Sequence, residues 1–270
     1  MADADPAIFA EGFHMDVEFV RHGSIATIKL NRPDKYNAVN EPMKKRLTEV
    51  FAELRLDEGV RAIILAGNGS AFCTGGDVST MGNFSPKSLE VRLRTSHKML
   101  LDIDAIEKPV IASVRGAVAG IGWSMAMVCD QIVASETAYF SQSFKNVGVI
   151  PDGGALYFLA QNIGVLRVKD LVLSGRRLPA QEALQLGLVT KLVPDDRLEE
   201  ETLALAQDLA DGPTLAYGIG KKLLKQVCPS GLGTFLDSEM WAQTVAVLSD
   251  DHKEGAQAFR EKRKPVFKGR

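Results

Sequence analysis

Apolar residues follow two patterns along the first two thirds of the chain, and each pattern predicts a different kind of element. Short, mostly apolar runs at residues 61–66, 110–114 and 131–134 are typical of strands that are buried on both faces. Residues 41–54 instead place apolar side chains every three or four positions, behind an asparagine cap, which predicts a helix with one buried face. A second helix is expected near residues 87–105. This alternation predicts an α/β architecture with a mostly parallel sheet.

The two ends of the chain have a different character. Residues 16–30 alternate apolar and polar side chains around His22 and Gly23, which predicts a hairpin. Beyond residue 195 no strand is expected, and the apolar spacing is helical in residues 196–211, 214–227, 232–248 and 251–263. We therefore expect an α/β region over residues 1–195 and an all-helical region over residues 196–270.

Composition limits the classes of function. The chain has 270 residues, of which 46% are hydrophobic and 24% charged, with a formal net charge of −2. This balance is typical of a soluble globular protein and gives no reason to expect a nucleic acid or a membrane as partner. Three widely spaced cysteines and four scattered histidines fit neither a disulfide framework nor a metal site, so we expect no metal. The N-terminal residues lack the features of a signal peptide, and we expect a cytoplasmic protein.

Two glycine-rich turns and one acid are the candidate chemical groups. The first turn, residues 72–77, follows the apolar run at 61–66. The second, residues 120–122, follows the run at 110–114, and Asp152 lies in a third glycine-rich segment. A strand, a glycine-rich turn and a helix together aim free backbone N–H groups at one place. Two such turns could hold an anionic oxygen, and a nearby acid could move protons.

Other interpretations of these residues find less support in the sequence. The glycines near residue 120 lack the spacing of a dinucleotide-binding fingerprint, and Ser124 does not lie in the Gly-x-Ser-x-Gly elbow of a hydrolase. Cys73 has no histidine placed to activate it, so a buried and inert thiol is favoured. Asp152 and Asp77 both fit helix caps, and propensity alone favours capping over catalysis for Asp152. The basic run at 260–270 is either a solvated tail or an anion contact.

Taken together, several sequence blocks resemble the crotonase family, also called the enoyl-CoA hydratase/isomerase superfamily. The resemblance covers nearly the whole chain, and several blocks in the same order are more specific than any one. The blocks are residues 31–39, 70–77, 108–130, 186–189 and 254–263. The resemblance implies a spiral of ββα units followed by helices that mediate trimerisation, and an assembly that is a homotrimer or a dimer of trimers.

The resemblance also implies a site for an acyl-CoA thioester. The backbone N–H groups of Gly76 and Ile121 would hold the thioester oxygen, although Ile121 stands where the family usually has glycine. Ser124 and Phe144 stand where hydratases of the family carry two glutamates, and would line the pocket. Asp152 matches the catalytic carboxylate of several isomerase-type members.

Contacts with the coenzyme A portion are implied more loosely. The expected residues lie near the first turn and near the C-terminus: Lys35, Tyr36, Thr74, Asp77, Val78, Phe259 and Lys262. The last two match family positions that approach the CoA bound by a neighbouring subunit. Acyl-CoA is the substrate in this scheme, and no cofactor is expected.

The favoured function is an isomerase that shifts the double bond of a 3-enoyl-CoA, with Asp152 as the acid and base. A single carboxylate suffices for such a 1,3-proton shift, whereas hydration requires a base for water and a proton donor for carbon. An enoyl-CoA hydratase is the nearest alternative. The departures at Ile121, Ser124 and Phe144 also leave open a CoA-binding or assembly protein without turnover.

Overall fold

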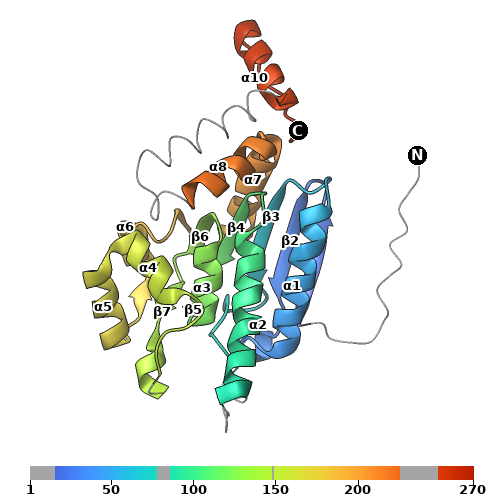
Figure 1. Ribbon diagram of the computed structural model, residues 1–270. Helices are drawn as coiled ribbons and strands as arrows, with labels where there is room; N and C mark the ends of the chain where they lie inside the picture. Colours follow the sequence, from blue (N-terminus) through green and yellow to red (C-terminus); the bar gives the residue numbers. More distant parts are fainter. Residues whose placement is uncertain (1–15, 78–85, 148, 226–248) are drawn as a thin grey trace, which may run out of the picture.

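A six-stranded sheet forms the centre of the protein in the computed structural model, which describes residues 16–77, 86–147, 149–225 and 249–270 (Figure 1). Its strand order is β1-β2-β3-β4-β6-β9. The strands are β1 Val17–His22, β2 Ile25–Leu30, β3 Ala62–Gly67, β4 Val110–Val114, β6 Gln131–Ser135 and β9 Lys191–Val193. β1 and β2 form an antiparallel hairpin, and all the other neighbours are parallel. The predicted hairpin, buried strands and mostly parallel sheet are confirmed.

A second, three-stranded sheet was not predicted. It consists of β5 Ala117–Ala119, β7 Tyr139–Ser141 and β8 Leu178–Pro179, in the order β5-β7-β8. β5 pairs in parallel with β7, and β7 pairs with β8 in antiparallel orientation. Strands of two or three residues are too short to produce a periodic pattern, which is why the sequence did not reveal them.

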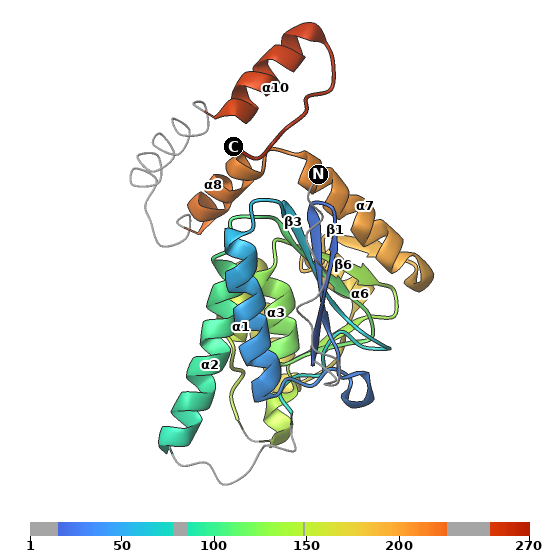
Figure 2. The same cartoon turned by 90° about the vertical axis from the view of Figure 1, so that its right-hand side faces the viewer.

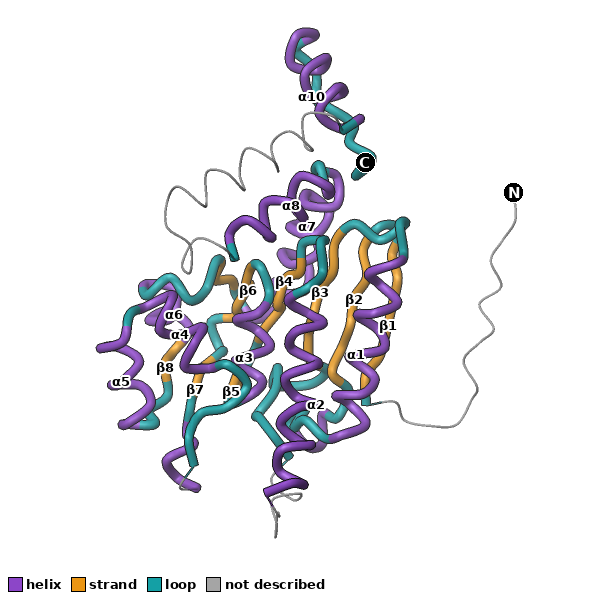
Figure 3. Tube along the Cα trace, in the orientation of Figure 1, coloured by secondary structure: helices purple, strands orange, loops and turns teal. Residues whose placement is uncertain are grey.

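Helices cover both faces of the larger sheet, with α1, α2 and α3 on one face and α7 on the other (Figures 2 and 3). The described helices are α1 Glu41–Leu56, α2 Pro86–Asp104, α3 Ile121–Val128, α4 Ala155–Ile163, α5 Val165–Ser174, α6 Ala180–Gln185, α7 Leu198–Asp211, α8 Thr214–Leu224 and α10 Asp250–Glu261. The predicted start of α1 is confirmed, because the Met43 N–H donates to the side chain of Asn40 (2.9 Å). None of the described helices is both long and apolar enough to cross a membrane.

The pleat of β3 divides the core into two layers. Ile63 and Leu65 join the large cluster that also contains the apolar faces of α1, α2 and α3. Ile64 points to the other face, where Leu198 and Ala206 of α7 cover the sheet. Because both faces of β3 are covered, nearly every residue of this strand is apolar, as the continuous run in the sequence indicated.

Arg61 fastens the C-terminal part of the chain to the sheet region. Its guanidinium donates to Gly212 O (2.5 Å), Thr214 Oγ1 (3.1 Å) and Phe267 O (2.6 Å). Asp251 of α10 is buried and accepts the backbone N–H groups of residues 268 and 269 at 2.6 and 2.8 Å. The basic C-terminal run is therefore folded back against its own helix and is not a freely solvated tail.

The C-terminal helices were predicted in part. α7, α8 and α10 correspond to three of the four helical segments expected after residue 195. The fourth, residues 232–248, lies outside the described residues. The division of the chain at residue 195 and the role of the second part in trimerisation stay predictions.

Ile64→Ala is expected to destabilise the fold through the α7 side of the sheet. The side chain is 5% exposed, so its loss leaves a cavity under α7 and should cost about 2–5 kcal/mol of unfolding free energy. Leu56→Ala is the control, because Leu56 is 82% exposed and its truncation should change stability by less than about 0.5 kcal/mol. Denaturant unfolding measures both, and equal effects of the two variants would contradict this account of the core.

Candidate active site

Short backbone pairings bring the two glycine-rich turns together. The Cys73 N–H donates to Ala117 O (3.0 Å), and the Ala119 N–H donates to Cys73 O (2.9 Å). The first turn therefore runs beside β5, which leads directly into the second turn. A methyl group built on Gly120 would lie 3.5 Å from the Cα of Gly75, so the two turns are in contact. Gly75 has a φ of +110°, a conformation that residues with a side chain adopt only under strain.

The backbone N–H of Gly76 has no acceptor in the described part of the chain, whereas the N–H groups of Gly75 and Asp77 on either side of it are bonded. The Gly75 N–H approaches the sulfur of Cys73 (3.4 Å), and Gly75 O accepts the Val39 N–H (2.8 Å). The Asp77 N–H donates to Val39 O (2.9 Å). Burial raises the pKa of the Cys73 thiol to about 12, so this cysteine is a neutral structural group, as its sequence context favoured.

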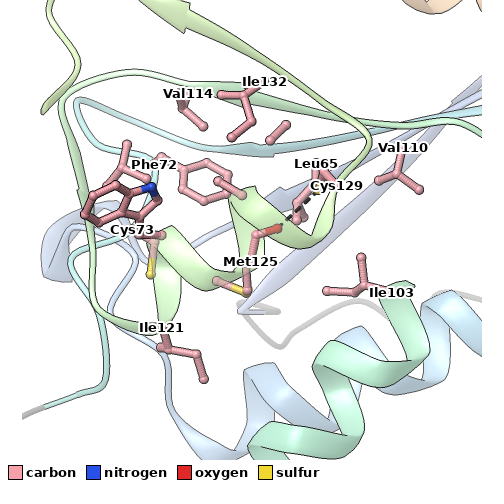
Figure 4. Packing of buried hydrophobic residues seen from close by; sticks show 14 of the residues in the cluster. Leu65, Phe72, Cys73, Ile103, Val110, Val114, Ile121, Met125, Cys129 and Ile132 are labelled. Carbon is pink, nitrogen blue, oxygen red and sulfur yellow. Dashed lines mark hydrogen bonds between the residues drawn. The ribbon is translucent and has the colours of Figure 1, made fainter. Parts of the chain in front are cut away.

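The N–H of Ile121 is a second donor of the same kind. Ile121 is the first residue of α3, and Gly120, which precedes it, provides no side-chain cap. The first hydrogen bond of this helix is donated by Ser124 N to Gly120 O (3.2 Å), which leaves the Ile121 N–H without an acceptor among the described residues. The helix dipole adds partial positive charge at this end. Figure 4 shows Cys73 beside the start of α3, where Ile121 lies.

The segment that carries Asp152 packs against this second donor. A methyl group built on Gly153 would lie 3.3 Å from Ile121 Cγ1, 3.3 Å from Ser124 Oγ and 3.4 Å from Leu100 Cδ1. Gly153 therefore packs against both α3 and α2. Asp152 is the residue directly before it. The predicted positions of the two amide donors and the acid are thus brought into one region.

The capping interpretation of Asp152 is wrong. α4 begins at Ala155 with Gly154 as its N-cap, and no side chain caps it. Asp152 takes part only through its backbone carbonyl, which accepts the Ala155 N–H (3.1 Å). The carboxyl group of Asp152 is therefore available for another role.

Burial and nearby cations act in opposite directions on Asp152. Burial raises the pKa of its carboxyl group above the ordinary value and is the largest effect. The positive charges of Lys44, His97 and Arg92 partly oppose it. The sequence analysis did not select these three residues, although Lys44 carried a signal: it lies on the buried face of α1, beside Met43 and one turn before Leu47.

Ser124 and Phe144 line the same region. Ser124 is fully buried, and its hydroxyl has no hydrogen-bond partner in the described part of the chain. The Phe144 ring would lie 3.7 Å from a methyl group on Gly120, so it covers the second turn. Neither side chain can act as the carboxylate that a two-glutamate mechanism requires.

The residues expected near coenzyme A meet in part at the first turn. The backbone N–H and hydroxyl of Thr74 donate to Tyr36 O at 3.1 and 3.3 Å, and Lys35 and Tyr36 are exposed there. Asp77 is buried and forms an ion pair with Arg32 (2.9 Å). Val78 lies outside the described residues.

The two C-terminal candidates lie elsewhere. Lys262 is exposed just beyond α10, which Figure 1 shows at the end of the molecule opposite to the start of α2. The side chain of Phe259 lies outside the described part of the chain. Their contact with CoA was expected from a neighbouring subunit, and it stays a prediction.

Asn37 is a supporting residue whose role the sequence analysis did not identify. Its side chain is fully buried, and its Oδ1 accepts the Arg32 N–H (2.9 Å). Its Nδ2 donates to Asn68 O (2.9 Å) and Ala71 O (2.8 Å), just before the first turn. The block at residues 31–39 thus holds this turn in place through Asn37, and the resemblance of that block to the family was the signal that could have pointed to it.

The sequence profile described as enoyl-CoA hydratase/isomerase matches residues 20–270. The chain belongs to this family. Family members act on acyl-CoA thioesters. The two turns are the positions at which the resemblance implies a thioester site, and that role stays a prediction. The crotonase fold and the enzyme class expected from the sequence are confirmed.

Individual relatives carry both kinds of name. A Rhodobacter capsulatus protein called "Probable enoyl-CoA hydratase" is 37% identical over 247 residues, which cover 91% of this chain and 95% of the relative. The 1,2-epoxyphenylacetyl-CoA isomerase of Escherichia coli is 33% identical over 251 residues, with the same coverage of 91% and 95%. A crystal structure of an enoyl-CoA hydratase from Bacillus anthracis superposes with a TM-score of 0.90 at 29% identity, covering 94% of this chain and all of that one.

Asn37→Ala is expected to loosen the first turn of this family member. It removes three hydrogen bonds and leaves buried backbone groups unpaired, which should cost about 2–4 kcal/mol of stability and lower turnover of acyl-CoA substrates. Asn162→Ala is the control, because Asn162 lies exposed on α4 and, among the described residues, its side chain bonds only to Phe158 O of its own helix. Thermal unfolding and steady-state kinetics of both variants test this. Wild-type stability and turnover in Asn37→Ala would refute the role of Asn37 in holding the turn.

Proposed function

We propose that this protein is an acyl-CoA isomerase that converts a 3-enoyl-CoA into a 2-enoyl-CoA, with Asp152 as its single acid and base. The observation that carries the proposal is the packing of the Asp152 segment on Ile121, with the Asp152 carboxyl group free of any capping role. The absence of a carboxylate at residues 124 and 144 supports it further.

The reaction follows from the three groups. The N–H groups of Gly76 and Ile121 bind the thioester oxygen and stabilise the negative charge that develops there. Loss of one such donor typically costs about 2.7–4 kcal/mol of transition-state stabilisation. The Asp152 carboxylate takes a proton from C2, which gives the enolate, and the carboxylic acid returns the proton at C4. The double bond moves from C3–C4 to C2–C3, and Asp152 is again ionised.

The remaining contacts are part of the same proposal. The coenzyme A portion lies along Lys35, Tyr36 and Thr74 at the mouth of the first turn, and the pocket wall includes Phe144. The protein works as a homotrimer or a dimer of trimers. Its acyl-CoA is a substrate, and the reaction uses no further cofactor.

A hydratase is the second candidate, favoured by the name of the Rhodobacter relative. Hydration requires a base that activates water and an acid that protonates carbon. Ser124 and Phe144 cannot ionise as glutamates do, so Asp152 would have to fill both roles or other residues would have to fill one of them. Incubation with a 2-enoyl-CoA followed by mass spectrometry separates the two, since only a hydratase adds the mass of water. Binding of acyl-CoA without any product would favour a CoA-binding protein.

Asp152→Asn is expected to lower isomerisation of a 3-enoyl-CoA by about 10²–10⁴-fold, because the amide cannot accept the proton. Deuterium incorporation from heavy water at C2 or C4 should fall with it. Asp208→Asn, on the exposed face of α7, is the control and should leave the rate unchanged. Full activity of the Asp152→Asn protein would reject the proposed function.

The pH dependence of the unaltered enzyme gives a further check on the role of Asp152. The ionised form of Asp152 is the base, so kcat/KM should fall as the pH drops through its pKa. Burial raises that pKa, and the fall should therefore begin at a higher pH than an exposed aspartate would produce.

A further inference from the structure

The guanidinium group of Arg92, on α2, lies against the first glycine-rich turn. Its Nη2 atom is 3.7 Å from the place where a methyl group on Gly76 would lie. Among the described residues other than the chain neighbours of Gly76, Arg92 alone comes within 4 Å of this place. The side chain of Arg92 is 20% exposed, whereas that of Arg94 on the same helix is 75% exposed. The charge of Arg92 therefore lies beside Gly76 and is only partly screened by water.

Backbone pairings hold the Gly76 end of this contact. The Val39 N–H donates to Gly75 O (2.8 Å), and the Asp77 N–H donates to Val39 O (2.9 Å), so Gly76 is held on both sides. Val39 is followed directly by Asn40, the N-cap of α1. The first turn is therefore fastened to the start of α1.

Polar contacts between α1 and α2 hold the other end. The two helices lie side by side (Figures 1 and 2). Lys44 Nζ of α1 lies 3.5 Å from Arg92 O, and Glu41 of α1 accepts the hydroxyl of Thr95 (3.1 Å). α1 thus connects the first turn to the backbone of Arg92, which fixes the distance between them.

Glu41 only partly offsets the charge of Arg92. Its Oε1 lies 4.0 Å from Arg92 Nη1 but accepts a shorter hydrogen bond from Lys44 Nζ (2.8 Å). Glu41 is also half exposed, which weakens its effect further. One carboxylate and two cations keep one positive charge, and Arg92 turns its Nη1 side to Glu41 and its Nη2 side to Gly76.

Asp77, which follows Gly76 directly, has a counter-ion of its own. Its carboxylate forms an ion pair with Arg32 (2.9 Å). This pair is formally neutral, so it does not cancel the positive charge that Arg92 places beside Gly76.

α2 also reaches the proposed acid. Leu100 Cδ1 would lie 3.4 Å from a methyl group on Gly153, the residue after Asp152. The positive charge of Arg92 is one of those that oppose the rise caused by burial in the pKa of the Asp152 carboxyl group. A test of Arg92 at the first turn must therefore be separated from its effect on Asp152.

We propose that Arg92 supplies fixed positive charge to the first oxyanion donor, and so stabilises the enolate that forms when the Gly76 N–H holds the thioester oxygen. The inference rests on the proposed role of Gly76 as that donor. A backbone N–H carries only partial positive charge, whereas a nearby guanidinium adds a full charge whose effect grows as the oxygen becomes negative. Arg92 contacts Gly76 and no reacting atom in this scheme, and is therefore a positioning residue.

Acetoacetyl-CoA is the probe, because it reports enolate stabilisation without turnover. This 3-oxoacyl thioester loses a proton from C2 to give an enolate that absorbs in the near ultraviolet, so its ionisation on the enzyme can be titrated. An Asp152→Asn background removes the acid whose own pKa depends on Arg92. In that background, Arg92→Gln should raise the pKa of the bound probe by about one pH unit, a tenfold loss of preference for the enolate. Arg92→Lys should retain most of this preference, because it keeps the charge.

Arg94→Gln is the matched control, because it removes the same charge from an exposed position of the same helix. It should leave the pKa of the bound probe unchanged. Equal pKa values in Arg92→Gln, Arg94→Gln and the parent protein would overturn the proposal. So would an equal loss of affinity for the neutral and the ionised probe, since that would assign Arg92 to ordinary binding of the thioester.

Kinetics with 3-hexenoyl-CoA give a second measurement that does not depend on the probe. Arg92→Gln in the otherwise unaltered enzyme should lower kcat about tenfold and change KM less than about twofold. The loss should persist at alkaline pH, where Asp152 is fully ionised. A loss confined to acid pH would mean that Arg92 acts only on Asp152, and a change in KM alone would mean that it binds substrate; either result would overturn the proposal. Arg92→Met replaces Arg92→Gln if that variant does not fold.

The two measurements separate this inference from the proposed function. If the pKa of the bound probe depends on Arg92 but no 3-enoyl-CoA is isomerised, only the function fails. If isomerisation depends on Asp152 but the pKa of the bound probe is the same with and without Arg92, only the role of Arg92 fails.

Discussion

The pairing of the first glycine-rich turn with β5 is the constraint on which the site depends. Two backbone hydrogen bonds between Cys73 and β5 place the turn that follows β3 against the turn that opens α3. Each turn alone would expose a free N–H to solvent, where it would contribute little to the binding of a negatively charged oxygen. The contact between Gly75 and Gly120 instead holds the two turns together. In the proposed function, their N–H groups would then need no reorganisation when negative charge develops.

Support for this pairing comes from residues that have no chemical role of their own. Asn37 ties the chain before the first turn, Arg32 holds Asp77 after it, and buried Cys73 takes the N–H of Gly75. These contacts fix both ends of the turn, and within residues 72–77 Gly76 is the residue whose N–H has no acceptor among the described residues. The same principle acts at α3, where Gly120 offers no side chain to cap Ile121.

The sequence predicted the larger sheet, α1 and the two turns, because each leaves a local signal: a continuous apolar run, a helical spacing or a cluster of glycines. It could not predict the second sheet, whose strands are too short for periodicity. Propensity also favoured a capping role for Asp152, since a Pro-Asp-Gly-Gly segment before a helix has that local appearance; the left-handed Gly154 takes the cap position instead. Lys44, Arg92 and His97 were missed because their relation to Asp152 exists only in the folded chain.

Ile121 and Gly153 together have a consequence for how this site can vary. A branched side chain at residue 121 fits because residue 153 presents only a hydrogen atom to it, at a φ of +60°. Any side chain at residue 153 would be strained by this backbone conformation and would also press on Ile121, at 3.3 Å from its Cγ1. The size of residue 121 alone therefore sets how much space lies between the start of α3 and the segment of Asp152.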